Sequence, residues 1–296
     1  MRIANLGGRL TLLLADGVID VATASNGRFS PDPQAAYENF DDLKRWAAAQ
    51  GVPATAEFDL STLDPATLGP PAPAPRQVFA IGLNYRDHAA EGGFTTLPEE
   101  PTVFTKFSSS LSGPVTDVSL PYGEVDWEVE IVAVISRTAR DVDVSKGWDH
   151  VAGLTVGQDL SERRLQMRGP APQFCLAKSH PGFSPTGPVL VTPDELADPD
   201  DLTLGCAVNG EEMQKARTAD MLFSIPQLVA YLSSIVTLYP GDVIFTGTPA
   251  GVGAGRTPSR FLGPGDELRS WVVGIGELRQ RFLSRTDSVV ASASAG

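Results

Sequence analysis

Acidic and apolar residues alternate through the segment VDWEVEI, residues 125–131. In a β-strand, residues i and i+2 point to the same side and lie about 7 Å apart, so Asp126, Glu128 and Glu130 are expected on one face. Like charges on one face repel each other, and no Lys or Arg lies at residues 107–136 to offset them. A hard cation with oxygen ligands would relieve the repulsion. A solvated outer strand face explains the alternation equally well.

A further carboxylate, Asp159, stands where the apolar segment GLTVGQ, residues 153–158, gives way to a polar one. It could join the strand carboxylates in a metal site. Taken by itself, an Asp at such a junction is more typical of a helix N-cap, whose side chain accepts a hydrogen bond from a backbone amide.

The segment NYRDHAAEGG, residues 84–93, carries a possible general base. On a helical turn His88 and Glu91 lie three residues apart and face the same side. A carboxylate bonded to an imidazole fixes its tautomer and raises its basicity, so the pair could take a proton from water. The glycines and the loop at residues 94–100 could form a lid. The alternative is an incidental pair at the end of a surface helix.

Several polar residues downstream could complete such a site. Lys178 stands among apolar residues, where a lysine either extends its amine to solvent or holds an anion. Arg163, Arg164 and Gln166 follow Asp159 and could face the same site. The glycine-rich segment at residues 247–253 lacks a phosphate-loop pattern, yet its amides could hold a carboxylate. No zinc-type cysteine spacing or serine-hydrolase motif is present.

The bulk composition excludes some partners. The 296 residues carry a net charge of −13, which argues against nucleic acid or an anionic membrane, because both require a basic surface. Two cysteines without a pairing signature favour a reducing compartment. No apolar run approaches the roughly 20 residues of a membrane helix. We therefore expect a cytoplasmic protein whose substrate is a small molecule.

Strand-like segments outnumber helices and do not alternate with them, which argues against a doubly wound sheet. Residues 3–23 are expected to form a small antiparallel sheet, and residues 126–135 and 267–276 one strand each. Asn209 and Gly210 predict a hairpin turn. The expected organisation has four parts: a small α+β domain at 1–70, a proline-rich linker at 71–76, a larger domain at 77–283 and a disordered tail at 284–296.

Two helices are also expected. Residues 41–50 are followed by Gly51, which is typical of a helix C-terminus. Ser224 and Gln227 have the spacing of a capping box and precede an apolar face that starts at Ile225.

Eight segments, in order, resemble the fumarylacetoacetate hydrolase family, over essentially residues 77–282. They are IGLNYRDHAAE (81–91), PTVFTKFSSSLSGP (101–114), DWEVEI (126–131), GLTVGQDLSERRLQ (153–166), AKSHPGFSPTGPVLVT (177–192), VNGEEMQ (208–214), LYPGDVIFTGTPAGVG (238–253) and FLGPGDELRSWVVGIGEL (261–278). The resemblance implies an α+β, mainly β fold: a mixed β-sandwich and β-roll with a small N-terminal domain, in a homodimer.

The resemblance also implies Mg²⁺ as the cofactor, with Mn²⁺ or Ca²⁺ as alternatives. Asp126 is not a ligand in the matching motif. One departure is the segment at residues 178–183, which borders the substrate in the family that the chain resembles. His180 could be an additional substrate contact, but a loop residue without such a role is the favoured alternative. The implied site residues fall into three groups: metal ligands Glu128, Glu130 and Asp159; catalytic residues His88, Glu91 and Lys178; and substrate-binding residues Tyr85, Arg163, Gln166 and Thr248.

The implied activity is hydrolysis of a C–C bond in a small anionic 2,4-dioxo acid of the acylpyruvate, fumarylpyruvate or fumarylacetoacetate type, through an enolate held at the metal. The same site could instead serve a decarboxylase, an isomerase or tautomerase, or a hydratase of a 2-oxo acid. An alternative of another class is a non-catalytic metal-binding protein. The His88–Glu91 pair argues against it, because a structural metal site needs no general base.

Overall fold

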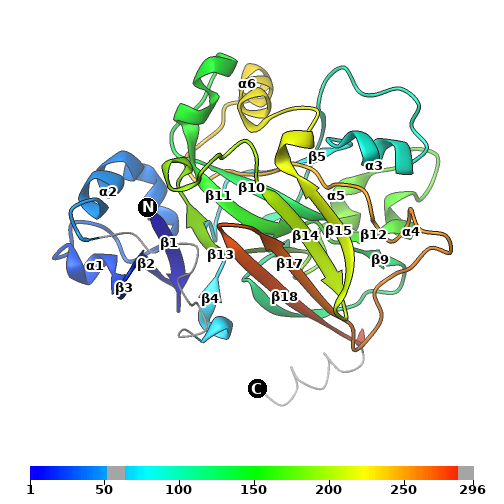
Figure 1. Ribbon diagram of the computed structural model, residues 1–296, viewed down its shortest axis with the longest axis horizontal. Coiled ribbons are helices and arrows are strands. Elements are labelled where there is room, and N and C mark those ends of the chain that lie inside the picture. The colour runs from blue at the N-terminus through cyan, green and yellow to red at the C-terminus, as the bar shows by residue number, and fades with distance from the viewer. Residues whose placement is uncertain (52–63, 286–296) are drawn as a thin grey trace.

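Strands dominate the computed structural model, which describes residues 1–51 and 64–285 (Figure 1). The predicted mainly β fold with mixed sheets is confirmed. Two short strands, β4 (Leu68–Gly69) and β7 (Leu111–Ser112), pair beside the main path of the larger sheet. The order along that path is β3 (Gly17–Asp20), β2 (Arg9–Leu14), β1 (Arg2–Leu6), β13 (Ser184–Val191), β11 (Val151–Gln158), β10 (Val129–Ile135), β16 (Val243–Phe245), β5 (Val78–Gly82) and β6 (Thr102–Thr105).

A second sheet packs on the central strands of the first. Its inward side chains, such as Leu204 and Leu278, share one buried core with Ile131 and Leu154 of β10 and β11. Burial of this apolar surface is the main force that holds the two sheets together. The order in the second sheet is β15 (Glu211–Arg217), β14 (Thr203–Val208), β17 (Glu267–Val272), β18 (Gly276–Leu283) and β8 (Val115–Ser119). A separate two-stranded sheet pairs β9 (Val125–Asp126) with β12 (Ser161–Glu162).

The strand expected at residues 126–135 is interrupted. β9 ends at Asp126 and β10 begins at Val129, so the prediction of one continuous strand is wrong. Backbone amides that leave a ladder must find other acceptors when they are buried. At this break, side-chain oxygens accept hydrogen bonds from three successive backbone amides. Asp126 accepts from Trp127 N (2.8 Å), Gln158 from Glu128 N (2.8 Å) and Gln214 from Val129 N (2.9 Å).

The segment expected as one strand at residues 267–276 is also divided. β17 ends at Val272, and β18 returns antiparallel from Gly276. Gly274 between them has a φ of 87°, a backbone conformation that a glycine adopts without strain. The glycines in this segment therefore mark a hairpin turn.

Two local predictions are confirmed. Asn209 and Gly210, with φ of 52° and 82°, form the turn between β14 and β15. Helix α6 (Ile225–Ile235) begins after Ser224, whose amide donates to Gln227 Oε1 at 2.8 Å. The other helices are α1 (Val21–Ala24), α2 (Phe40–Ala47), α3 (Arg86–Glu91), α4 (Arg163–Gln166) and α5 (Phe174–Ala177), with 3-10 turns η1 (Gln34–Asn39), η3 (Pro65–Thr67), η4 (Ser108–Ser110), η5 (Val144–His150), η6 (Pro193–Glu195) and η7 (Thr218–Asp220).

The predicted N-terminal antiparallel sheet is present as β1, β2 and β3, and it continues into the larger sheet. β1 pairs with β13, with Ile3 opposite Leu190. The Tyr37 hydroxyl donates to the Pro71 carbonyl at 3.0 Å, which ties the start of the expected linker to this region. The division at residues 71–76 stays a prediction, and most of the expected tail, residues 286–296, lies outside the described residues.

Gly157 of β11 lies where a larger residue would disturb the core. A Cβ there would lie 2.4 Å from Val132 Cγ2 and 2.8 Å from a Phe245 ring carbon. We expect Gly157→Ala to lower the free energy of unfolding by about 1–3 kcal/mol through overpacking. Denaturant titration measures the change, with Gly263→Ala as the control, because its added methyl meets only Asp266 at 3.7 Å. Equal stabilities of the two variants would contradict the packing account.

Candidate active site

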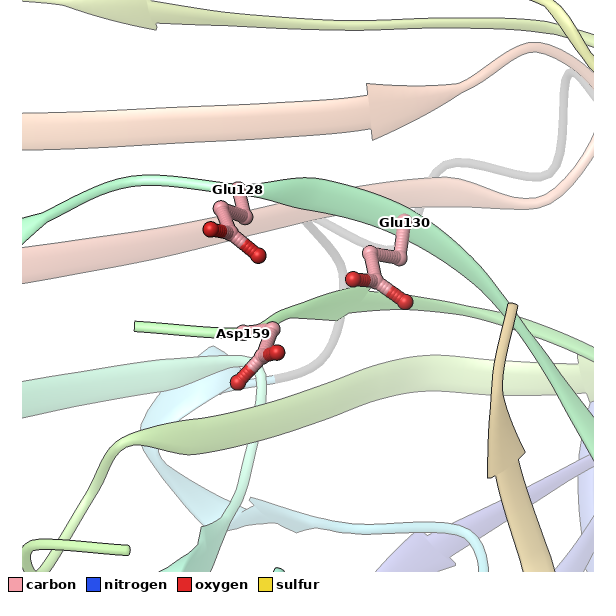
Figure 2. Close-up of side chains that lie close together, drawn as sticks. All are labelled: Glu128, Glu130 and Asp159. Carbon is pink, nitrogen blue, oxygen red and sulfur yellow. The ribbon is translucent and has the colours of Figure 1, made fainter. Parts of the chain in front are cut away.

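Three buried carboxylates converge between β10 and β11 (Figure 2). Glu128 lies in the break before β10, Glu130 lies within it, and Asp159 follows β11. The Asp159 amide donates to the Glu128 carbonyl at 2.9 Å, so antiparallel pairing brings these residues side by side. One carboxylate oxygen from each residue lies within 4.8 Å of the others. Asp126 is not part of this group, and the N-cap of α4 is Glu162 and not Asp159.

Two buried lysines bind this carboxylate triad, Glu128–Glu130–Asp159. Lys178 Nζ donates to Glu128 Oε2 at 2.8 Å and to Asp159 Oδ2 at 2.7 Å. Lys106 Nζ donates to the other Asp159 oxygen and to the Lys178 carbonyl. Lys106 is not among the predicted site residues. The one sequence feature that could have pointed to Lys106 was its place in the family segment at residues 101–114. A local pattern could not reveal its contact with Asp159, which lies 53 residues away.

Arg163 joins the triad to Asp126, which is not a ligand in the family motif. Its guanidinium lies 2.8 Å from Glu128 Oε1 and 2.7 Å from Asp126 Oδ2. It also donates to Gln166 Oε1 at 3.0 Å. Asp126 accepts from the Gly253 amide at 2.6 Å, so it fixes both Arg163 and the glycine-rich segment.

The triad fits a hard divalent cation. All its donors are carboxylate oxygens, which Mg²⁺ and Mn²⁺ prefer. Burial, then repulsion from Asp159 and Glu128, raises the pKa of Glu130 well above its usual range. The Glu130 carboxylate accepts a hydrogen bond from the Gly247 amide at 2.7 Å. A cation held between the three carboxylates would remove the repulsion.

The predicted His88–Glu91 pair is formed on α3. His88 Nδ1 lies 3.4 Å from Glu91 Oε2, and Glu91 Oε1 accepts from the Gly251 amide at 3.0 Å. Burial opposes ionisation of Glu91, but the bonds from His88 and Gly251 outweigh it and lower its pKa. Glu91 therefore both faces the imidazole and attaches α3 to the 247–253 segment.

A cleft of about 740 Å³ brings most of the predicted residues together. Thr248 is among them; its hydroxyl donates to the Val129 carbonyl at 2.9 Å. Tyr85 is buried outside the lining, with its hydroxyl unpartnered among the described residues. His180 also lies outside, where its ring packs on Phe183. Of the predicted site residues, the lining contains His88, Glu91, Glu128, Arg163, Gln166, Lys178 and Thr248.

A family model described as fumarylacetoacetate (FAA) hydrolase C-terminal matches residues 77–283. The chain belongs to the fumarylacetoacetate hydrolase family. The resemblance predicted from the sequence segments is therefore confirmed.

Relatives within the fumarylacetoacetate hydrolase family differ in the activities they are named for. Human mitochondrial oxaloacetate tautomerase FAHD2A is 42% identical over 81% of this chain and 75% of its own. A solved candidate HpcE protein from Mycobacterium smegmatis is 56% identical, with a TM-score of 0.88 over 96% of this chain and 99% of that one. Maleylpyruvate hydrolase from Sphingobium sp. SYK-6, solved with manganese(II) and pyruvate, is 29% identical, with a TM-score of 0.75 over 96% and 99%.

Among the described residues, no helix has the length and apolar character needed to cross a membrane. The cytoplasmic location stays a prediction, since the human family member is named as mitochondrial.

Metal binding predicts a measurable stabilisation. At a hundredfold excess over Kd, Mn²⁺ or Mg²⁺ should raise the free energy of unfolding by about 2.7 kcal/mol. Glu130→Gln should lose most of this gain. In EDTA it should be more stable than the parent protein, because the change removes a buried carboxyl whose ionisation is opposed by burial and by Asp159 and Glu128. Denaturant titrations with and without metal measure both effects.

Asp117→Asn, on an exposed residue paired with Arg281, is the control and should keep the full gain in stability from the metal. Undiminished stabilisation of Glu130→Gln would rule out the triad as the metal site.

Proposed function

We propose that this protein is a metal-dependent hydrolase that cleaves a C–C bond in 2,4-dioxo acids. The observation that carries the proposal is that one cleft is lined by the His88–Glu91 pair, Lys178 and Glu128, and that Glu130 and Asp159 lie directly beside Glu128. A metal ion with a purely structural role would not need an imidazole paired with a carboxylate in the same cleft. A hydrolase needs a base for water, a polarised carbonyl and a cation for the developing oxyanion.

Glu128, Glu130 and Asp159 would hold the metal ion, with Mg²⁺ as the proposed ion and Mn²⁺ or Ca²⁺ as alternatives. When bound, the ion would supply Lewis-acid polarisation of the substrate's carboxylate and 2-oxo oxygens. Arg163 and Lys178 hold two of these ligands in place through bonds to their oxygens.

In the proposed reaction, Glu91 orients His88 through Nδ1, which leaves Nε2 to take a proton from water. The hydroxide adds to the C4 carbonyl carbon of the substrate. The C3–C4 bond then breaks, its electron pair passes to C3 of the pyruvate fragment, and C3 takes a proton. Burial opposes the Lys178 charge, but Asp159 and Glu128 outweigh it and raise its pKa, so Lys178 stays cationic and can stabilise the oxyanion at C4.

Tautomerisation of oxaloacetate is the second candidate. It is supported by the name of the human relative, which is 42% identical to this chain. The same imidazole would move a proton between C3 and the enol oxygen, and no water would be consumed. The two activities therefore differ in whether a C–C bond breaks.

Substitution of the base tests the proposed mechanism. We expect His88→Ala to lower kcat about 10²- to 10⁴-fold, which is the usual contribution of a general base. Glu91→Gln should lower it less, because the imidazole remains. Asp87→Asn, exposed on the same helix, is the control and should leave kcat unchanged. Steady-state assays on the best substrate measure these values, and full activity of His88→Ala would refute water activation.

A substrate screen separates the candidate functions. With Mg²⁺ present, we expect acylpyruvates to yield pyruvate and a carboxylic acid, and EDTA to abolish the reaction. Decay of enol-oxaloacetate absorbance without pyruvate release would instead support the tautomerase. If acylpyruvates, fumarylpyruvate and oxaloacetate all stay unchanged, the protein is a non-catalytic metal-binding member of the family.

A further inference from the structure

One wall of the cleft is aromatic and begins beside the carboxylate triad. The Phe104 ring centroid lies 5.1 Å from Lys178 Nζ, and the Phe174 ring packs edge-on at 5.5 Å from Phe104. Phe94 and Met167 also line the cleft but are 52% and 62% exposed, so they lie toward its mouth. A group attached to a substrate held at the triad would therefore meet an apolar surface.

The cleft offers few positive charges for that distal group. Among the described residues of its lining, only Lys178, Arg163 and, when protonated, His88 can be cationic. Lys178 already faces Glu128 and Asp159, and Arg163 faces Asp126 and Glu128. Glu91, which also lines the cleft, adds negative charge. A second carboxylate on the substrate would lose its hydration in the cleft without gaining a free cationic partner. Such desolvation is energetically unfavourable.

The charges around the triad lead to the same conclusion. Asp126 and the three triad carboxylates face Lys106, Lys178 and Arg163, so four negative charges meet three positive ones when all are ionised. A divalent cation would change the sum from one negative to one positive charge. One substrate carboxylate then neutralises the site.

We propose that this site, if the protein has the function proposed above, selects 2-oxo acids with a single carboxylate and an uncharged, apolar distal group over dicarboxylates. Alkyl and aryl acylpyruvates belong to the favoured class, and oxaloacetate and fumarylpyruvate to the disfavoured one. The cleft volume of about 740 Å³ leaves space for such a group, since small-molecule sites span roughly 300–1,000 Å³.

Binding of 2-oxo acids that lack a 4-oxo group tests this selectivity without turnover. Isothermal titration of the Mn²⁺-loaded protein would compare 2-oxobutanoate, 2-oxopentanoate and 2-oxohexanoate with 2-oxohexanedioate. We expect Kd to fall about threefold for each added methylene, as for partial burial of apolar surface. The dicarboxylate should bind at least about tenfold more weakly than 2-oxohexanoate.

A charge introduced at the mouth should alter the preference. Met167→Lys is expected to improve the affinity for 2-oxohexanedioate relative to 2-oxohexanoate by about threefold or more, as for an exposed ion pair. Leu176→Lys is the matched control, because Leu176 is 65% exposed but lies outside the cleft lining. It should leave the ratio unchanged.

Equal or tighter binding of the dicarboxylate to the unmodified protein, or equal ratios in the two lysine variants, overturns the selectivity. The outcomes separate this proposal from the hydrolase function. Selective binding without cleavage of any acylpyruvate would refute the hydrolase and support the selectivity. Cleavage of fumarylpyruvate as fast as alkyl acylpyruvates, with equal affinities, would support the hydrolase and refute the selectivity. If no 2-oxo acid binds, both fail.

Discussion

The structure depends on the neutralisation of the carboxylates that it buries. Asp126, Glu128, Glu130 and Asp159 all lie in the interior, where an unpaired charge is strongly unfavourable. The cationic partners of Asp126, Glu128 and Asp159 come from three separate places: Lys106 follows β6, Arg163 begins α4 and Lys178 follows α5. Removal of one partner from a buried pair typically costs about 3–5 kcal/mol. The site is therefore complete only when segments far apart in the sequence have all packed together.

The interrupted strand is the second constraint, because it sets where two of the carboxylates point. Gln158 and Gln214 accept hydrogen bonds from backbone amides in the break, and each also bonds elsewhere. Gln158 donates to Ser270 Oγ, and Gln214 donates to Thr248 Oγ1 and the Pro249 carbonyl, each at 2.7–2.8 Å. The same two side chains thus connect the break to the second sheet and to the glycine-rich segment. The backbone around the triad is held by specific bonds and not by apolar packing alone.

Much of this arrangement could be predicted from the sequence, and the exceptions share a physical reason. The alternation at Glu128 and Glu130 and the order of the family segments predicted the triad, which the structure forms. Local reasoning alone favoured an N-cap for Asp159, because a short-range pattern does not reveal a residue on the neighbouring strand. Lys106 was missed for the same reason. The break at residues 127–128 was missed because two irregular residues leave an alternating pattern almost unchanged.

The His88–Glu91 pair shows how position and chemistry are linked in this fold. Glu91 is the only residue of the described α3 helix whose side chain bonds both the imidazole and the glycine-rich segment. A Cβ at Gly255 would lie 2.4 Å from the Glu91 side chain, so this close approach requires glycine. The glycine-rich segment is fixed in turn by Asp126, which also binds Arg163. A chain of bonds therefore runs from the buried triad through Arg163 and Asp126 to Glu91. The Glu91 carboxylate both attaches α3 to the glycine-rich segment and orients His88. The imidazole is therefore correctly placed only when α3 packs against that segment, which Asp126 holds in position.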